Sequence, residues 1–155
     1  MQDAIAHGGG GSYSSSGRLS PGGGGGGRGG GGGGGQAGNA VEILTPTEGV
    51  DFSSYIQRML ATVKRNWYAV MPESAIMGDK GIVYTTFQIN ADGSVPQPDP
   101  ILDRTSGKDP LDTAAMSSIR ASSPFEPLPP QFHGPYIRIR LIFLYNLPLD
   151  QANLR

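Results

Sequence analysis

Residues 81–91 carry the clearest pattern of hydrophobic and polar positions in the chain. Apolar or β-branched side chains occupy every second position from Val83 to Ile89, which is the period-two signature of a half-buried strand. The segment runs into Asp92-Gly93, a dipeptide that supplies the positive-φ positions of a tight hairpin. The pattern predicts a strand, a turn and a second strand that returns antiparallel to the first.

The returning strand, residues 94–103, contains Pro96, Pro98 and Pro100. Proline lacks the N–H that a sheet ladder needs, so three prolines normally argue against a strand. Because all three have the same parity, their missing N–H groups lie on one side of the strand, and the other side remains free to pair. This predicts an edge strand whose outer side cannot accept another chain. A proline-rich peptide ligand is the alternative interpretation, which the directly preceding hairpin turn disfavours.

The last apolar segment, residues 136–145, is long and has no internal proline. It predicts a third, long strand. One parity is expected to face the core: Ile137, Ile139, Leu141, Phe143 and Tyr145. The opposite parity is mixed in character: Tyr136, Arg138, Arg140, Ile142 and Leu144.

Two other segments show helical periodicity. The first is expected to be capped by Asp51 or Ser54 and to end at Pro72. Its apolar stripe comprises Phe52, Tyr55, Ile56, Met59, Leu60, Val63, Trp67 and Val70. The second helix is predicted from Asp109-Pro110 to Ser122, with proline at the first helical position and a stripe of small residues suited to packing on a sheet.

Composition divides the chain into unequal parts. Nineteen of the 25 glycines lie in residues 1–40, and such a segment buries too little apolar surface to offset the entropy of ordering it. The sequence therefore predicts a disordered Gly/Ser-rich linker over residues 1–40 and an entry segment over residues 41–50. The folded domain is expected over residues 51–147, followed by a tail over residues 148–155.

Charge and reactive groups narrow the function. Outside the linker, ten Lys and Arg stand against twelve Asp and Glu, so no basic face for nucleic acid is evident. The chain has no cysteine, and His7 and His133 are far apart in the sequence. The HExxH, GxSxG, phosphate-loop and EF-hand spacings do not occur. We expect no nucleic-acid partner, no metal, no cofactor and no enzymatic activity.

Several short sequence motifs follow one another in the chain, beginning with Trp67 and Pro72 and then GIVYTTFQINADGSV at residues 81–95. They continue with Ser106-Gly107, Leu111-Asp112, Ala114-Ala115, Pro124-Phe125 and Pro127-Leu128-Pro129. Together, over residues 52–146, the order and spacing of these motifs resemble the C-terminal domain of TonB-type energy transducers. The TolA C-terminal domain is a weaker match.

The resemblance implies an α+β fold in which two helices pack on a three-stranded antiparallel sheet of strand order 2-1-3, preceded by the disordered Gly-rich tether. It implies a periplasmic domain tied by an N-terminal membrane helix to a proton-channel complex of the inner membrane. Such a domain grips a short peptide near the N-terminus of an outer-membrane TonB-dependent receptor and so couples the proton motive force to transport. The membrane helix and a targeting segment are missing from this sequence. The chain is therefore expected to be a fragment or a truncated version.

Strand order 2-1-3 leaves two edges, of which the prolines block one. The last strand is therefore the predicted site for the partner peptide, by β-augmentation: Tyr136, Ile137, Arg138, Ile139, Arg140, Leu141, Ile142, Phe143 and Leu144. The two arginines fit either protection of a charged edge or contacts with acidic groups of the partner. The same edge could pair two copies of the domain, so a homodimer is a further expectation.

Two alternatives to the transducer remain open at this point. One is a TolA-like structural protein of the envelope that bridges membranes without gating transport. The other is a cytoplasmic interaction module with a disordered tail.

Overall fold

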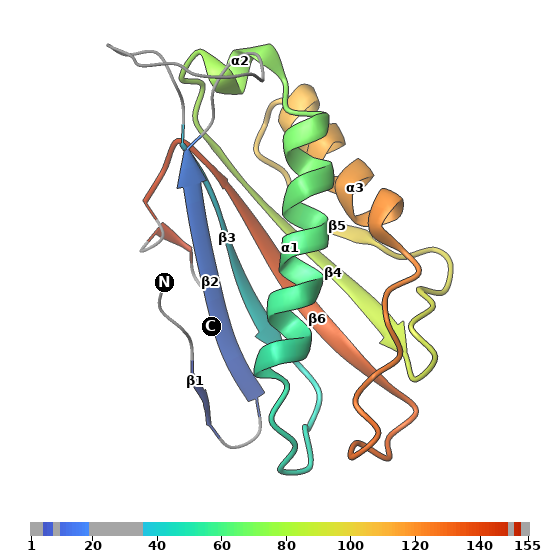
Figure 1. Ribbon diagram of the computed structural model, residues 1–155. Coiled ribbons are helices and arrows are strands. Elements are labelled where there is room, and N and C mark those ends of the chain that lie inside the picture. Colours follow the sequence, from blue (N-terminus) through green and yellow to red (C-terminus); the bar gives the residue numbers. More distant parts are fainter. Residues whose placement is uncertain (1–4, 8–9, 19–35, 149–150, 153–155) are drawn as a thin grey trace.

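In the computed structural model, the chain forms one antiparallel sheet with helices α1 and α3 on one of its faces (Figure 1). The structure describes residues 5–7, 10–18, 36–148 and 151–152, and for the first two ranges it describes the backbone alone. The elements in chain order are β1 (Ile5–His7), β2 (Gly10–Arg18), β3 (Gln36–Ile43), α1 (Ser53–Ala69), α2 (Glu73–Ile76), β4 (Gly81–Asn90), β5 (Ile101–Arg104), α3 (Asp109–Ser122) and β6 (Tyr136–Tyr145).

The order of strands across the sheet is β1-β2-β3-β6-β4-β5, and all neighbours are antiparallel. The α+β class is confirmed, whereas the expected sheet of three strands in the order 2-1-3 is wrong. The strands β5, β4 and β6 stand side by side, and β3, β2 and β1 extend the sheet beyond β6. The last strand of the chain therefore lies inside the sheet, with a neighbour on each side.

The added strands come from segments that were expected to lack regular structure. The strands β1 and β2 lie within residues 1–40, and β3 crosses the expected boundary between linker and entry segment. The prediction of disorder is wrong for these three segments, while residues 19–35 lie outside the described residues. For β3 the physical reason is burial, because Ala37, Val41 and Ile43 share one parity and all join the core under the helices.

The hairpin after β4 has the predicted turn but a shorter second strand. The Gly93 N–H donates to the Asn90 carbonyl at 2.8 Å, and Gly93 has φ +94°. The strand β5 begins only at Ile101, after the three prolines, so the predicted pairing from residue 94 is wrong. The parity argument fails with it, because Asp99 meets β4 through its side chain: its Oδ2 accepts the Gln88 N–H at 2.8 Å.

The two predicted helices are confirmed. The stripe of α1 is buried from Tyr55 to Trp67, whereas Val70 is 46% exposed at the helix end. The helix begins at Ser53, two residues earlier than a Ser54 cap would allow, and the Asp51 carboxylate accepts the Ser53 N–H at 2.9 Å. The helix α3 starts at Asp109 with Pro110 in its first turn, as expected. The single-turn helix α2, directly after Pro72, was not predicted.

A buried chain of hydrogen bonds joins α1, β6 and α3. The Trp67 indole N–H donates to the Tyr145 hydroxyl at 2.8 Å, and that hydroxyl donates to the Leu111 carbonyl at 2.7 Å. The Trp67 and Phe143 rings pack edge to face, with 4.9 Å between their centroids. Burial raises the pKa of the Tyr145 hydroxyl above its ordinary value of 10.0. The helices and the last strand are thus held together at one polar point inside an apolar core.

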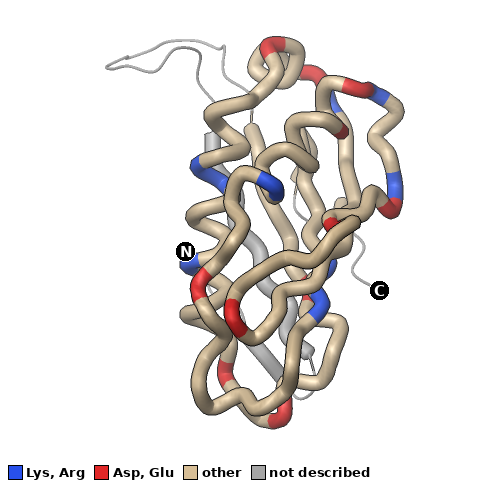
Figure 2. Tube along the Cα trace, turned by 90° about the vertical axis from the view of Figure 1, so that its right-hand side faces the viewer, with Lys and Arg blue, Asp and Glu red and all other residues tan. Residues whose placement is uncertain are grey.

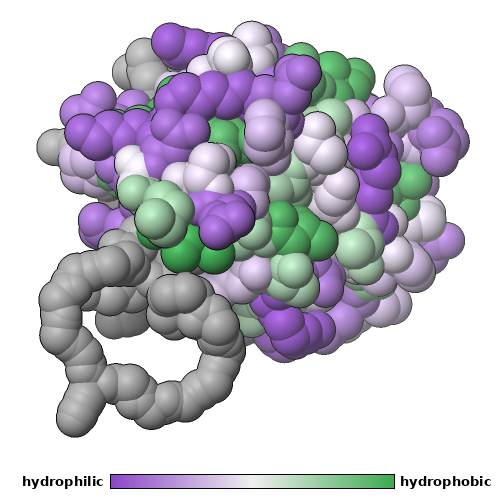
Figure 3. All heavy atoms as spheres, turned by 90° about the horizontal axis from the view of Figure 1, so that it is seen from above, coloured by the Kyte–Doolittle hydropathy of each residue, from purple (hydrophilic) through white to green (hydrophobic). Residues whose placement is uncertain are grey.

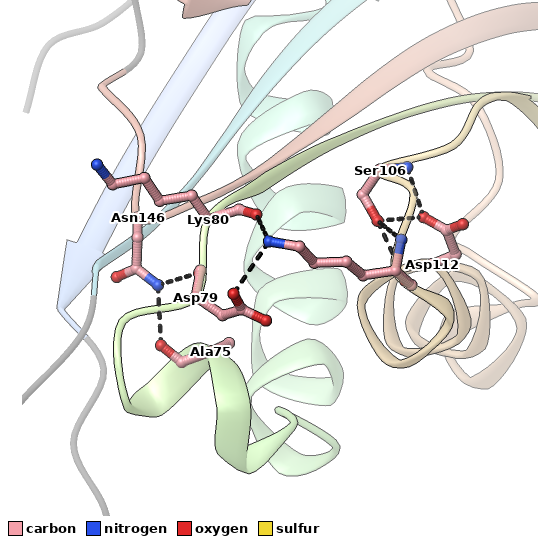
Figure 4. A network of polar contacts seen from close by, with 7 residues as sticks. Ala75, Asp79, Lys80, Ser106, Asp112 and Asn146 are labelled. Atoms are coloured by element: carbon pink, nitrogen blue, oxygen red, sulfur yellow. Dashed lines mark hydrogen bonds and ion pairs between the residues drawn. The ribbon is translucent and has the colours of Figure 1, made fainter.

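The end of β6 is fixed by a second polar network (Figure 4). The Asn146 side-chain amide donates to the Ala75 carbonyl at 2.9 Å and to the Asp79 carbonyl at 2.5 Å. The Lys108 ammonium bridges the Asp79 carboxylate at 3.0 Å and the Lys80 carbonyl at 2.8 Å. This network joins the α2 segment to the C-terminal end of β6 and to the start of α3.

Candidate functional site

The candidate site is the side of β6 that faces away from β4. The Leu44 N–H donates to the Arg138 carbonyl at 2.8 Å, and the Asn146 N–H donates to the Gln36 carbonyl at 2.7 Å. Hydrogen-bonded pairs alternate along an antiparallel ladder, so the even-numbered residues of β6 direct their backbone groups to this side. We call it the outer edge of β6, made by the backbones of Arg138, Arg140, Ile142 and Leu144.

The outer edge of β6 is already occupied by the chain itself. The strand β3 pairs with it at seven positions, from Ala37 opposite Tyr145 to Ile43 opposite Ile139. The following loop continues the cover, since the Thr45 hydroxyl accepts the Arg138 N–H at 3.1 Å. The premise that the last strand is an open edge is therefore wrong. That a partner peptide binds here stays a prediction.

The nine predicted site residues fall into three groups by the face of the sheet on which they lie and by their burial. Those facing the helices are fully buried: Ile137, Ile139, Leu141 and Phe143. On the opposite face, Ile142 and Leu144 are also fully buried, in a small cluster with Ala40 and Tyr84 against which Leu147 and Ala152 pack. The remaining three, Tyr136, Arg138 and Arg140, are partly exposed. The six buried side chains hold the strand in place, and a partner on this edge would meet backbone groups and the arginine-bearing end of the strand.

Both arginines of β6 face carboxylates of the same chain. The Arg140 guanidinium lies 3.7 Å from the carboxylate of Glu42, its register partner on β3. The Arg138 guanidinium lies 3.6 Å from the carboxylate of Asp99, whose side chain is 7% exposed. In the view of Figure 2, basic and acidic residues are interspersed along the described trace rather than gathered by sign. Each arginine of β6 thus has an acidic neighbour.

The sequence analysis did not predict β3, the strand that covers the outer edge of β6. Its helix-facing residues, Ala37, Asn39, Val41 and Ile43, occur at every second position, which is the available signal for a strand. Gly38 and the polar Asn39 interrupt the apolar pattern, and the glycine-rich composition of the preceding residues masks it further. Asn39 is fully buried, and the hydrogen bond that its side-chain amide donates to the Ile142 carbonyl is long, at 3.4 Å.

The strand β5 forms the opposite end of the sheet. It has four residues, and its exposed apolar side chains are Ile101 and Leu102. Its charged side chains are already engaged, because the Asp103 carboxylate accepts the Thr86 hydroxyl and the Arg104 guanidinium lies 5.1 Å from the centre of the Tyr84 ring. This edge is shorter than the outer edge of β6 and offers fewer backbone groups to a partner.

A hollow of about 120 Å³ lies between α1 and the segment that follows α3. Its polar groups are used within the chain: Arg58 pairs with Glu126 at 3.0 Å, and the Tyr55 hydroxyl donates to the Glu126 carbonyl at 2.7 Å. Around α2, Val70 and Met77 are exposed, and Figure 3 shows hydrophobic residues on this side as small areas among hydrophilic ones. Neither feature presents a continuous apolar or charged surface comparable with a ten-residue strand.

A family model described as "TonB C terminal" matches residues 52–141. The chain belongs to this family. Among solved structures, it is similar to the NMR solution structure of the Helicobacter pylori TonB C-terminal domain, at 28% identity and a TM-score of 0.48. That match covers 66% of this chain and 88% of the other. The search of curated proteins returned no match.

The strand β3 lies outside the residues that the family model matches. The match begins at Phe52, before α1, and ends at Leu141, within β6. All three strands β1, β2 and β3 precede it. The strand that covers the outer edge of β6 thus lies on the N-terminal side of the matched residues. Within the described residues, no helix has the length and apolar character needed to cross a membrane.

Proposed function

We propose that this TonB-type domain is the periplasmic adaptor of an energy transducer, normally anchored in the inner membrane. In this role it couples the proton motive force to transport through outer-membrane receptors, and it does so without catalysis. A short peptide near the receptor's N-terminus pairs with the outer edge of β6. Membership of the TonB C-terminal family supports the transport role.

The observation that carries the proposal is the pairing of β6 with β3. A segment outside the matched residues 52–141 lies antiparallel along seven residues of the strand, and it does so in register. Addition of a strand to a sheet edge is an established mode of peptide recognition, in which backbone hydrogen bonds supply affinity. The edge of β6 is therefore geometrically able to bind an extended segment.

The anchoring of β6 suits a strand that transmits a pull. It is paired with β4 along ten positions, from Gly81 opposite Tyr145 to Asn90 opposite Tyr136. Its C-terminal end is fixed to α1 and α3 by the hydrogen bonds of Tyr145, and to the α2 segment by those of Asn146. A load on the outer edge would thus be shared by both helices and the neighbouring strand.

The proposal is tested by NMR on the intact chain, titrated with peptides from the N-terminal plugs of outer-membrane receptors. We expect shifted amide signals at Arg140, Ile142 and Leu144, whose N–H groups face the outer edge. Arg140→Pro removes one of these N–H groups and should abolish binding, whereas Arg140→Ala keeps the N–H and should retain most of it. A folded Arg140→Pro variant that binds as well as the unchanged chain would refute the edge assignment. No response to any receptor peptide would favour an envelope-bridging role without transport.

A homodimer paired through β6 is subject to the same geometry. A second copy would need the backbone groups that β3 now engages. The receptor peptide and a second copy are therefore alternative occupants of one edge, and both require β3 to leave it.

A further inference from the structure

We propose that β3 competes with the partner peptide for the outer edge of β6. The ion pair between Glu42 and Arg140 determines how firmly β3 is bound there, and it favours an acidic residue in the peptide that replaces β3. This inference rests on the proposed function, because it assumes that the partner uses the outer edge of β6. It adds a displaceable internal strand and a chemical requirement on the partner.

The first step is that β3 leaves no room on the edge. It pairs from Ile139 to Tyr145, and the bonds from Leu44 and Thr45 extend the cover to Arg138. Each backbone N–H or C=O has one neighbour in a ladder, so a peptide cannot pair with these residues while β3 is in place. Binding in this register requires exchange of one strand for another.

The second step is that β3 is held less firmly than β4, the other neighbour of β6. The strand β4 pairs along ten positions and contributes Val83, Phe87 and Ile89 to the core, all fully buried. The strand β3 pairs with β6 along seven positions, and its second ladder joins it to β2, so β2 and β3 can leave this edge together. It includes Ala37, Gly38 and Ala40, so it buries less apolar side-chain area per residue against β6 and the helices. It also buries the amide of Asn39 beside a carbonyl 3.4 Å away, and a poorly bonded polar group opposes burial. Of the two neighbours, β3 is the one that a peptide can replace.

The third step concerns the effective concentration at which β3 competes with a peptide for the edge. The strand β3 is joined to α1 by residues 44–52, so after release it stays near the edge. A segment on a short linker competes at an effective concentration in the millimolar range. A peptide in solution can bind only the molecules in which β3 has left the edge, so its apparent affinity equals its affinity for the open edge multiplied by the fraction of such molecules. Loosening β3 should therefore tighten peptide binding even though the edge itself is unchanged.

The fourth step gives the chemistry of the partner. Glu42 lies directly opposite Arg140, with 3.7 Å between the charged groups, and each side chain is about one-third exposed, at 30% and 31%. A peptide in the same register places its own residue at the position of Glu42. An acidic residue there keeps Arg140 paired, whereas a basic one faces it as a like charge. The flanking positions, held now by Val41 and Ile43, face the core and suit apolar β-branched residues.

The experiment uses the full chain and two synthetic probes. One peptide has the sequence of residues 36–45, QAGNAVEILT, and the other carries lysine in place of its glutamate. In the Glu42→Lys chain the internal strand is weakened while Arg140 is unchanged. We expect this variant to bind the acidic peptide about five- to tenfold more tightly than the unchanged chain does, the size expected when an attractive cross-strand pair becomes repulsive. The lysine peptide should bind this variant more weakly than the acidic peptide by a similar factor.

A charge swap and a remote reversal serve as controls. The double variant Glu42→Lys/Arg140→Glu restores an opposite-charge pair within the chain, so β3 should cover the edge again and both peptides should bind weakly. Glu126→Lys reverses the charge of one partner of the exposed Arg58–Glu126 ion pair, between α1 and the segment that follows α3, and should leave peptide binding unchanged. Circular dichroism establishes that each variant is folded, and Glu42→Gln is a milder substitute if the reversal unfolds the chain.

The outcomes separate this inference from the proposed function. Equal affinity of the acidic peptide for the unchanged and Glu42→Lys chains, with no change in the amide signals of β3, would overturn the inference. If receptor peptides still shift Arg140, Ile142 and Leu144 in that case, the proposed function stands. If neither these probes nor receptor peptides perturb β6 in any variant, both proposals fail.

Discussion

Gly93, at the turn after β4, shows how one residue meets two requirements at once. Its φ of +94° lies in the left-handed region, which an Asp-Gly turn signal predicts. The second requirement comes from a distant part of the chain, because a Cβ on Gly93 would lie 2.1 Å from the Phe125 carbonyl oxygen. The Phe125 N–H also donates to the Gly93 carbonyl at 2.8 Å. The turn tip is thus the docking point of the segment that leads from α3 to β6.

Gly93→Ala should therefore destabilise the domain more than a positive φ alone explains. The left-handed conformation costs about 1–2 kcal/mol for a residue with a Cβ, and the overlap with backbone at residue 125 adds about 1–3 kcal/mol. Gly107→Ala is the matched control, since Gly107 has φ +85° and no atom within 4 Å of its built Cβ. Urea unfolding of both variants measures the difference. Equal losses would mean that the close approach at Gly93 carries no energetic weight.

The strand β6 has a different neighbour on each side, and its backbone N–H groups alternate between them. Its odd-numbered residues direct their N–H groups to β4, as the bond from Ala91 to the Pro135 carbonyl indicates, and its even-numbered residues direct theirs to β3. Local opening in proteins spans free energies from near zero up to that of global unfolding. A strand that detaches alone exposes one parity of amides and leaves the other protected.

Native-state hydrogen exchange on the intact chain should show this parity. We expect the amides of Arg140, Ile142 and Leu144 to exchange at least about tenfold faster than those of Ile139 and Leu141, which corresponds to a difference of about 1.4 kcal/mol in opening free energy. The Glu42→Lys variant should widen the gap, because it weakens only the β3 side. Equal protection of both parities would indicate that β3 leaves only when the whole sheet unfolds.

At the scale of the whole molecule, the sheet has two unequal faces. The face under α1 and α3 holds the large core that includes Trp67 and Phe143. The opposite face holds a cluster of four buried residues, covered in part by Leu147 and Ala152 near the C-terminus. The expected tail therefore includes a residue that packs on the sheet.

Leu141 and Leu144 allow the two faces to be compared with one substitution, since both are leucines on β6 and both are fully buried. Leu→Ala replacements in cores cost about 2–5 kcal/mol, and the cost falls where the surroundings can collapse into the space. We expect Leu141→Ala, in the helix-covered core, to lie near the upper end of that range. Leu144→Ala should lie near the lower end because a chain-terminal segment forms part of its cover. Thermal or urea unfolding would contradict this if Leu144→Ala were the more damaging change.

The periodicity of the sequence by itself determined α1, α3, β4, β6 and the turn at Gly93, because each of these elements carries its own strong local signal. The tertiary structure decided the ends of the sheet. Three prolines kept residues 96–100 out of the ladder, and β3 joined it although its preceding glycines favoured disorder. The candidate site was predicted as a strand but not as a covered edge. Whether an edge is open depends on which distant segment pairs with it, and a short segment such as Gln36–Ile43 gains its stability from the core it completes rather than from its own sequence.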